Sequence, residues 1–413
     1  MTEPKKSNAK STVVKFSLLA VITLLLLIPL EMVKGLIKER EYTLADVKRE
    51  IADSYAGNQT VFAPRLMSTV VVKSAANPSE TTMQSNTCMS YEVNYDADID
   101  TKNLHRSLYD VTVYNSSVKI TGKIAPDANS INAVKNEIHL DISDFKGLAD
   151  IPQLRFGDKT YTFEKSQIKD DVYLGATVNF PEGTKEGDLI DYEITMGLKG
   201  TEVLIFEAFA HTTTLHMKSQ YPHPSFQGGF LPENRDVNED GFEADWKVLW
   251  MNVNNHDNNL GVKFIEPANP YQQATRSAKY GMLIIILVFV AGLFVEFLTK
   301  REISSLQYAI IGLSLILFYS LLLSFSELVV FGYAYLIAAV MTTAALILYF
   351  KAILRNKAAY MLGLFTAAVY GVNYILLQME TYALLVGSLI LFILLCVVMY
   401  LTADLNNRKA EAV

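Results

Sequence analysis

The sequence predicts a membrane α-helical bundle of six transmembrane helices joined to a large, mainly-β extracytoplasmic domain with an antiparallel, sandwich-like architecture. Two observations predict the bundle. Hydrophobic residues make up 51% of the 413 positions, and they gather near the N-terminus and in the last third of the chain. The third observation predicts the β-domain, because apolar and polar residues alternate over short stretches between those two regions.

The last third contains five apolar runs, each close to the ~20 residues that a transmembrane helix requires. They cover residues 281–298, 306–325, 329–350, 358–378 and 382–401. A sixth run, 16–33, follows a basic tail and resembles a signal sequence. It lacks the small residues that a cleavage site requires, so we expect an uncleaved anchor.

These runs divide the chain into five parts. We expect a cytoplasmic tail at 1–15, an anchor helix at 16–34, a periplasmic domain at 35–278, a five-helix bundle at 279–402 and a cytoplasmic tail at 403–413. Basic residues occur in alternate connections, at Lys300, Arg301, Lys351, Arg355, Lys357, Arg408 and Lys409. The connections at 326–327 and 379–381 have no Lys or Arg, so the positive-inside rule places both termini in the cytoplasm.

The middle segment begins with a helical pattern over 31–55 and then changes to a period of two. Alternation predicts strands at 91–99, 118–124, 138–142, 172–180, 190–198 and 242–250. In the first of these, the apolar set from Tyr91 to Ile99 is expected on one sheet face. Prolines at 222, 224 and 232 predict an ordered loop over 221–240 instead of a central strand. Either one large sandwich or two β units would fit this length.

Charge restricts the partners of the middle segment. Residues 36–278 have 23 Lys and Arg against 35 Asp and Glu, and 23 − 35 = −12. Nucleic acid and anionic lipid would repel this segment. The two cysteines, Cys88 and Cys396, lie in different predicted environments, so no disulfide is expected.

Few residues point to chemistry. His211, His216 and His223 are close in sequence, but the odd spacing of the first two would place them on opposite faces of a strand, which disfavours a metal site. No nucleophile-elbow, zinc-protease, phosphate-loop or paired-cysteine motif occurs. We therefore expect no catalytic residue, metal or cofactor, and no enzyme activity.

Two carboxylates are candidate intramembrane polar groups, namely Glu296 within the run 281–298 and Glu327 in the connection at 326–327. An intramembrane carboxylate is costly and suggests a functional site. Glu296 precedes Lys300 by four residues, so a carboxylate that pairs with this lysine is the simpler interpretation. The alternative is that Glu296 binds a proton or contacts a partner.

Three groups of residues resemble one family. The first is the anchor with its exit, 24–29 with 38–42. The second is the loop Tyr221, Pro222, His223, Pro224, Ser225, Phe226 and onward to Pro232, together with Trp246. The third is 294–299 with 307–308, 312–315 and 324–327. In this order they resemble the CreD family of bacterial inner-membrane proteins, known as cell envelope integrity proteins, over nearly the whole chain.

The resemblance implies a multi-pass inner-membrane protein associated with envelope maintenance and with a two-component stress regulon, and it transfers no catalytic residue. Two departures from the family are Ala63-Pro64 and Ser304-Ser305, where the family often has Gly-Pro and His-Pro. We expect the β-domain to bind a protein or a peptidoglycan-related component, with the loop at 221–232 and Trp246 as the contact. The alternatives are a small-molecule transporter and, more weakly, an envelope hydrolase. The predicted bundle has no proline or evident repeat, which disfavours transport.

Overall fold

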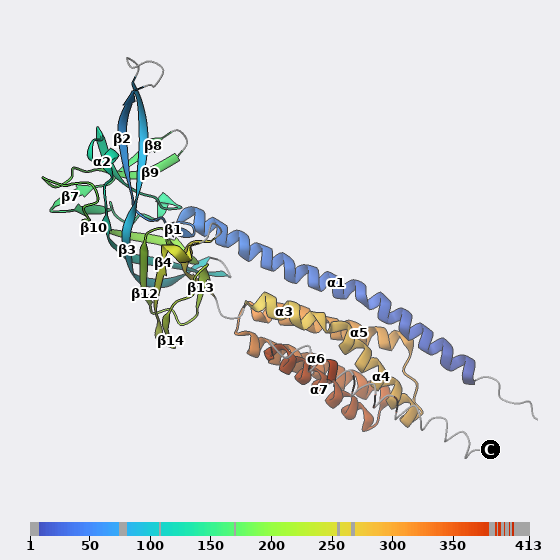
Figure 1. Ribbon diagram of the computed structural model, residues 1–413. Coiled ribbons are helices and arrows are strands. Elements are labelled where there is room, and N and C mark those ends of the chain that lie inside the picture. Colours follow the sequence, from blue (N-terminus) through green and yellow to red (C-terminus); the bar gives the residue numbers. More distant parts are fainter. Residues whose placement is uncertain are drawn as a thin grey trace, which may run out of the picture. The chain divides into compact units, whose positions relative to one another are not determined.

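The computed structural model describes residues 8–73, 81–106, 109–168, 171–253, 257–265 and 269–379, with separate positions between 385 and 399. Its contacts divide the chain into two compact units, which we call the membrane unit (Met1–Thr43 and Ala268–Val413) and the β-domain (Leu44–Pro267). Helix α1 (Asn8–Ser54) contributes residues to both units and runs without a break through Pro29 (Figure 1).

The described part of the membrane unit consists of helices and short connections between them. Besides α1 it contains α3 (Pro270–Lys279), α4 (Gly281–Thr299), α5 (Ser305–Ser326), α6 (Phe331–Leu354) and α7 (Ala358–Gln378). Helices α4 to α7 match the first four predicted C-terminal runs to within a few residues. Local capping residues fix the ends, since Ser304 and Gln307 form a capping box at the start of α5 and Lys300 ends α4 in a left-handed conformation.

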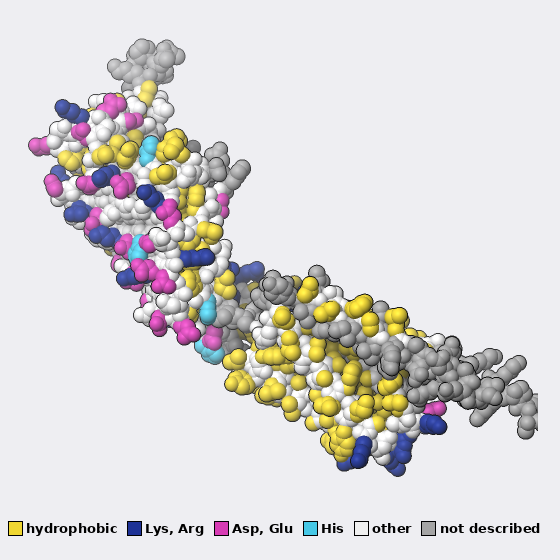
Figure 2. All heavy atoms as spheres, turned by 60° about the horizontal axis from the view of Figure 1, so that its bottom comes forward, with side chains coloured by type: hydrophobic (Ala, Val, Ile, Leu, Met, Phe, Trp, Pro, Cys, Tyr) yellow, Lys and Arg dark blue, Asp and Glu magenta, His cyan; other side chains and the backbone are white. Residues whose placement is uncertain are grey.

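Four described helices are long and apolar enough to cross a membrane, namely α1, α5, α6 and α7. A fifth span is formed if α3 and α4 cross together, although they bend by 43° at their junction. The last predicted span, 382–401, lies almost entirely outside the described residues. Figure 2 shows hydrophobic side chains over the surface of the helices and charged side chains over the β-domain, as expected for a helical unit that faces lipid.

The β-domain is built from short strands. They are β1 (Gln59–Val61), β2 (Arg65–Lys73), β3 (Thr81–Arg106), β4 (Tyr109–Ile124), β5 (Lys135–Leu140), β6 (Gln153–Phe156), β7 (Lys159–Thr162), β8 (Glu164–Ile168), β9 (Asp171–Thr177), β10 (Ile190–Thr201), β11 (Val203–Glu207), β12 (Thr212–Ser219), β13 (Pro224–Gly228), β14 (Asn234–Asn238), β15 (Gly241–Leu249) and β16 (Asn259–Phe264). Three short helices interrupt them, α2 (Ala128–Ile131), η1 (Phe145–Gly147) and η2 (Trp250–Asn252).

Twelve strands form one large, strongly curved sheet, and β1, β11, β16 and β13 form a second sheet of four. The long strand β3 joins two parts of the large sheet, because its first half pairs with β2 and its second half with β4 and β12. Most pairs are antiparallel, but β12 pairs with β3 and β1 with β11 in parallel. The expected antiparallel arrangement therefore holds for most strand pairs, and these two parallel pairs depart from it.

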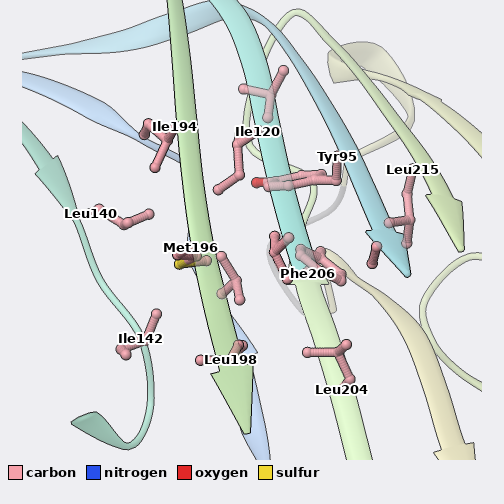
Figure 3. Close-up of a cluster of buried hydrophobic side chains, with 14 of the residues drawn as sticks. Tyr95, Ile120, Leu140, Ile142, Ile194, Met196, Leu198, Leu204, Phe206 and Leu215 are labelled. Atoms are coloured by element: carbon pink, nitrogen blue, oxygen red, sulfur yellow. The ribbon is translucent and has the colours of Figure 1, made fainter. Parts of the chain in front are cut away.

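One hydrophobic core serves both sheets, so the β-domain is one unit and not two. It contains residues from Val61 to Phe264, contributed by both sheets. Figure 3 shows Tyr95, Phe206 and Met196 pointing into this core from different strands. The alternation read from the sequence explains the core, because residues two apart on a strand share a face. All six strands predicted from alternation are present.

The segment 221–240 was expected to be a loop. It contains two short strands, β13 and β14, and each is at the edge of its sheet. Proline explains the position of β13, because Pro224 is its first residue, where a missing N–H group is tolerated. The prediction that no central strand crosses this segment is confirmed, but the prediction of a loop throughout was wrong.

Candidate functional site

The structure brings together two of the predicted contact residues, Phe226 and Trp246. Their rings lie 5.6 Å apart and nearly edge to face, and the indole N–H of Trp246 donates a hydrogen bond to the Phe230 carbonyl at 3.2 Å. However, Trp246 is only 2% exposed. Its position attaches β13 to β15 and leaves no indole surface for a partner.

The rest of the predicted loop attaches β13 to its neighbour β16. The Tyr221 hydroxyl donates to the Ile265 carbonyl at 2.8 Å, and its ring packs edge-on against Phe264 at 5.4 Å. Ser225 accepts a hydrogen bond from the Gln227 side chain at 2.9 Å. His223 is exposed, while Pro222 and Pro224 are half-buried. The segment 221–226 is therefore mainly structural.

A different group of aromatic residues is exposed on the β-domain. The rings of Tyr91 and His211 are 5.0 Å apart, and those of His211 and Trp250 are 5.9 Å apart. The exposed fractions are 47% for Tyr91, 58% for Trp250 and 72% for the adjacent Met251. We call these four residues the aromatic patch. Exposed tryptophan, tyrosine and methionine side chains are typical of interaction surfaces.

Sequence reasoning missed this patch because it assigned two of its members to the core strands. Tyr91 was expected on the buried face, but the pairing of β3 with β4 shifts register between Ser90 and Glu92. A β-bulge of this kind redirects the side chain of the extra residue. Trp250 was expected within the last predicted strand, but β15 ends at Leu249 and Trp250 begins the short helix η2.

The polar face of the large sheet contains hollows. One of them has a volume of about 840 Å³ and includes Asp98, Asp100 and Asp150 in its lining. Asp150 is already a structural group, because it accepts a hydrogen bond from the Gly197 N–H at 2.8 Å. His216 lies outside this hollow and pairs with Asp245 at 2.8 Å. Among the residues described, no three His, Cys, Asp or Glu side chains form an arrangement that could hold a metal ion.

One histidine of the β-domain is buried. His139 stacks on Tyr173 with ring centroids 3.9 Å apart, and it is 6% exposed. Burial lowers the pKa of its imidazole, although the nearby Glu137 and Asp141 act in the opposite direction. We therefore expect a neutral His139 in the folded domain at pH 7.

In the membrane unit, Glu296 on α4 accepts two hydrogen bonds with one carboxylate oxygen. The donors are the Lys15 ammonium, at 2.7 Å, and the Ile303 backbone N–H. The carboxylate side chain is 9% exposed. The expected partner Lys300 instead ends α4 in a left-handed conformation, so the lysine paired with Glu296 comes from α1.

A second carboxylate, Glu327, directly follows the C-terminal end of α5, whereas Glu296 lies on α4, before the N-terminal end of α5. Its carboxylate accepts a hydrogen bond from the Tyr271 hydroxyl at 3.3 Å and lies 3.6 Å from the Arg40 guanidinium. Lys15 and Arg40 are 25 positions apart on α1, which corresponds to about 38 Å along a helix. This exceeds the ~30 Å hydrocarbon core, so the two ion pairs can fasten α1 at both membrane faces.

A profile of one protein family, described as "Inner membrane protein CreD", matches residues 11–407. The chain belongs to the CreD family. It is also 27% identical over 415 aligned residues to the inner membrane protein CreD of Escherichia coli K12, a match that covers 93% of this chain and 91% of that protein. The apolar helices and the family together identify a multi-pass membrane protein of the CreD type.

One of the solved structures that match this CreD-family chain illustrates how weak the likeness is. An M1 zinc metallopeptidase from Deinococcus radiodurans aligns with a TM-score of 0.23 and 7% identity, over 46% of this chain and 53% of that one. A score this low supports no conclusion about fold or activity.

The bundle of this CreD-family protein also buries neutral polar groups beside the α3–α4 junction. The Asn373 amide donates to the Ser277 hydroxyl at 2.9 Å and to the Tyr335 hydroxyl at 3.0 Å. Tyr335 in turn donates to the Tyr370 carbonyl at 2.8 Å. We call Ser277, Tyr335, Tyr370 and Asn373 the buried polar cluster. It joins α3, α6 and α7, and local sequence patterns do not indicate that these residues meet.

Proposed function

We propose that this protein is a non-enzymatic inner-membrane protein that supports cell envelope integrity or the envelope stress response. Its β-domain lies in the periplasm and binds a protein partner or a peptidoglycan-related component through the aromatic patch. In this proposal the gene belongs to a two-component stress regulon, as the family resemblance implies. The membrane unit anchors the domain and contacts the lipid bilayer.

The proposed orientation is supported by the ion pairs of the membrane unit. Lys15, before the first apolar run, contacts Glu296 close to the α4–α5 connection that contains Lys300 and Arg301. The N-terminal end of α1 is therefore at the same end of the unit as this basic connection. Because basic connections are retained in the cytoplasm, both belong on the cytoplasmic side, and the chain that follows Arg40 belongs on the periplasmic side.

The observation that carries the binding proposal is the exposure of Tyr91, Trp250 and Met251, with the His211 ring in contact with both Tyr91 and Trp250. Such side chains contribute large contact areas, and they dominate binding energies at many interfaces. The acidic balance of the surrounding segment makes nucleic acid an unsuitable partner. The buried Trp246, by contrast, explains why the segment 221–232 is the weaker candidate.

Site-specific photo-crosslinking in living cells tests this proposal. A photoreactive residue at Met251 or Tyr91 should give adducts with a protein or glycan under envelope stress, and Trp250→Ala should weaken the adducts from Met251. The matched control is Ile151, which is 65% exposed on the same domain and lies outside the patch. Equal labelling from Ile151, or no adduct from Met251 and Tyr91 under any stress, would contradict the proposal.

Transport is the second candidate, and two observations now favour it more than the sequence did. The α3–α4 span is bent by 43°, and the buried polar cluster lies beside the bend. Transporters often bind their substrates where a helix is interrupted. Substrate accumulation in vesicles should then depend on Asn373. Transport that is unchanged in Asn373→Leu would contradict a role for the buried polar cluster in transport. If transport is undetectable in the unmodified protein, binding remains as the single candidate function.

A further inference from the structure

The buried polar cluster of the membrane unit contains one amide that is incompletely bonded. The Asn373 nitrogen uses both of its N–H groups, one toward Ser277 and one toward Tyr335. The amide oxygen is buried, and the described residues give it no hydrogen bond. If the amide is turned by 180°, the oxygen gains these two hydroxyl partners and the nitrogen loses them. Either orientation leaves one polar end of a side chain that is 3% exposed without a partner.

Two buried tyrosine hydroxyls in the same region also lack a hydrogen bond. They belong to Tyr319 on α5 and Tyr370 on α7, and the described residues provide no partner for either. Both side chains are 1% exposed. Their rings pack against the ring of Phe318 at 5.0 and 4.3 Å, and the Tyr335 ring contacts it at 5.2 Å. Because Tyr335 also bonds to Asn373, the three incompletely bonded groups belong to one set of contacting side chains.

This set of side chains lies near one end of the helices and beside the bend of the α3–α4 span. Asn373 is five positions before Gln378, the last residue of α7, and Tyr319 is seven positions before Ser326, the last residue of α5. These spacings correspond to about 8 and 11 Å of helix. The Tyr319 ring also reaches the bend, since its Cε2 is 3.3 Å from the position of an added β-carbon on Gly281. Ordered water often bonds the backbone groups that such an interruption frees.

We propose that the buried polar cluster, together with Tyr319, binds water molecules inside the membrane unit. Water donates to the Asn373 oxygen and accepts from the hydroxyls of Tyr319 and Tyr370. A lipid ester offers acceptors alone and would leave the Asn373 oxygen without a donor. A buried ion would need a group of opposite charge, and the cluster contains none. Water both donates and accepts, and an internal water molecule typically makes about three hydrogen bonds to buried polar groups.

Bound water distinguishes this part of the membrane unit from an ordinary helical anchor. The core of an anchor packs through small and apolar residues and requires no water. Here the hydrated groups surround the place where the α3–α4 span bends by 43°. Hydration does not depend on transport, so water occupies the cluster whether or not a solute crosses the membrane.

X-ray radiolytic labelling of the full-length protein in nanodiscs tests the proposal. The X-ray pulse converts water into hydroxyl radicals, which oxidise the side chains next to it, and mass spectrometry maps the products. We expect Tyr319 and Tyr370 to be oxidised several-fold faster than Tyr114. Tyr114 is the matched control, because it is a tyrosine with 0% exposure whose hydroxyl donates to the Val203 carbonyl at 2.8 Å. Oxidation of Tyr319 and Tyr370 that is no faster than that of Tyr114 would overturn the proposal.

Thermal unfolding of Tyr370→Phe in the same nanodiscs gives an independent test. If water bonds to the Tyr370 hydroxyl, its removal loses a hydrogen bond and lowers the unfolding midpoint. A buried hydroxyl without any partner is costly, so its removal would raise the midpoint, and that result would overturn the proposal. The control is Tyr333→Phe, which should leave the midpoint unchanged, because Tyr333 is 68% exposed on α6. Tyr370→Phe should also slow the oxidation of Tyr319, since the bound water loses one of its donors.

Discussion

The β-domain and the membrane unit place their polar and apolar side chains in opposite positions. In the β-domain the core is apolar and the charged residues are outside, so a large aromatic residue such as Trp246 is almost fully buried. In the membrane unit the apolar residues Leu336 and Leu364 are among the most exposed, while Glu296 and Asn373 are buried. Lipid, in contrast to water, gives an unsatisfied polar group no hydrogen bond.

This contrast changes what burial and exposure indicate in each unit. An exposed aromatic residue is informative in the β-domain, where water is the solvent, but is ordinary on a lipid-facing helix. A buried carboxylate is informative in the membrane unit, because its removal leaves donors without an acceptor. The strongest predictions therefore concern Trp246 and Trp250 in the first unit and Glu296 in the second.

The largest expected effect separates the two tryptophans. Trp246→Ala should lower the free energy of unfolding by about 3–5 kcal/mol, since it removes a buried ring that contacts Phe226. Trp250→Ala should change it by no more than about 0.5 kcal/mol, because the side chain is largely exposed. Chemical denaturation of the full-length protein in detergent, followed by tyrosine and tryptophan fluorescence, measures both. Similar losses in the two variants would contradict the assignment of Trp246 to the core and Trp250 to the surface.

The next effect concerns Glu296. Glu296→Ala leaves the buried Ile303 N–H without its acceptor and should cost about 1–3 kcal/mol. Glu296→Gln should cost less, because its amide oxygen can still accept from Ile303 although the charge that faces Lys15 is lost. Thermal unfolding in detergent compares the two variants. If they are equally unstable, the ion pair with Lys15 matters and the bond to Ile303 does not.

The sequence predicted most of the elements because their patterns are local. Apolar runs located α4 to α7, and alternation located strands such as β4 and β10. It could not predict the partners of Glu296 and Glu327, because Lys15 and Arg40 lie far away along the chain and meet them only after the helices pack. The aromatic patch was missed for a different reason. A single bulge at Tyr91 reverses the face of one side chain, and alternation alone does not reveal it.

A smaller effect depends on pH and involves the buried His139. Burial lowers the pKa of this imidazole in the folded domain, whereas the unfolded chain takes up its proton at the ordinary value of about 6.5. The unfolded state therefore binds more protons as the pH falls below that value, and stability declines. His139→Gln should weaken this dependence between neutral and mildly acidic pH in denaturation experiments. If the free energy of unfolding of His139→Gln depends on pH as it does in the unmodified protein, groups other than His139 cause that dependence.

The smallest effect is expected at the pair of Arg40 and Glu327, and it provides the test of how α1 is held. Arg40 is half-exposed and its nitrogen is 3.6 Å from the carboxylate, so a double-mutant cycle with Arg40→Ala and Glu327→Gln should give a coupling of about 0–1 kcal/mol. About 1 M salt should remove most of it, because the Debye length is then only ~3 Å. The corresponding cycle with Lys15→Ala and Glu296→Gln should give a larger coupling that resists salt, since Glu296 is the more buried carboxylate. If both pairs respond to salt alike, the two ends of α1 are held with equal strength, and the end near Lys15 is not the firmer attachment.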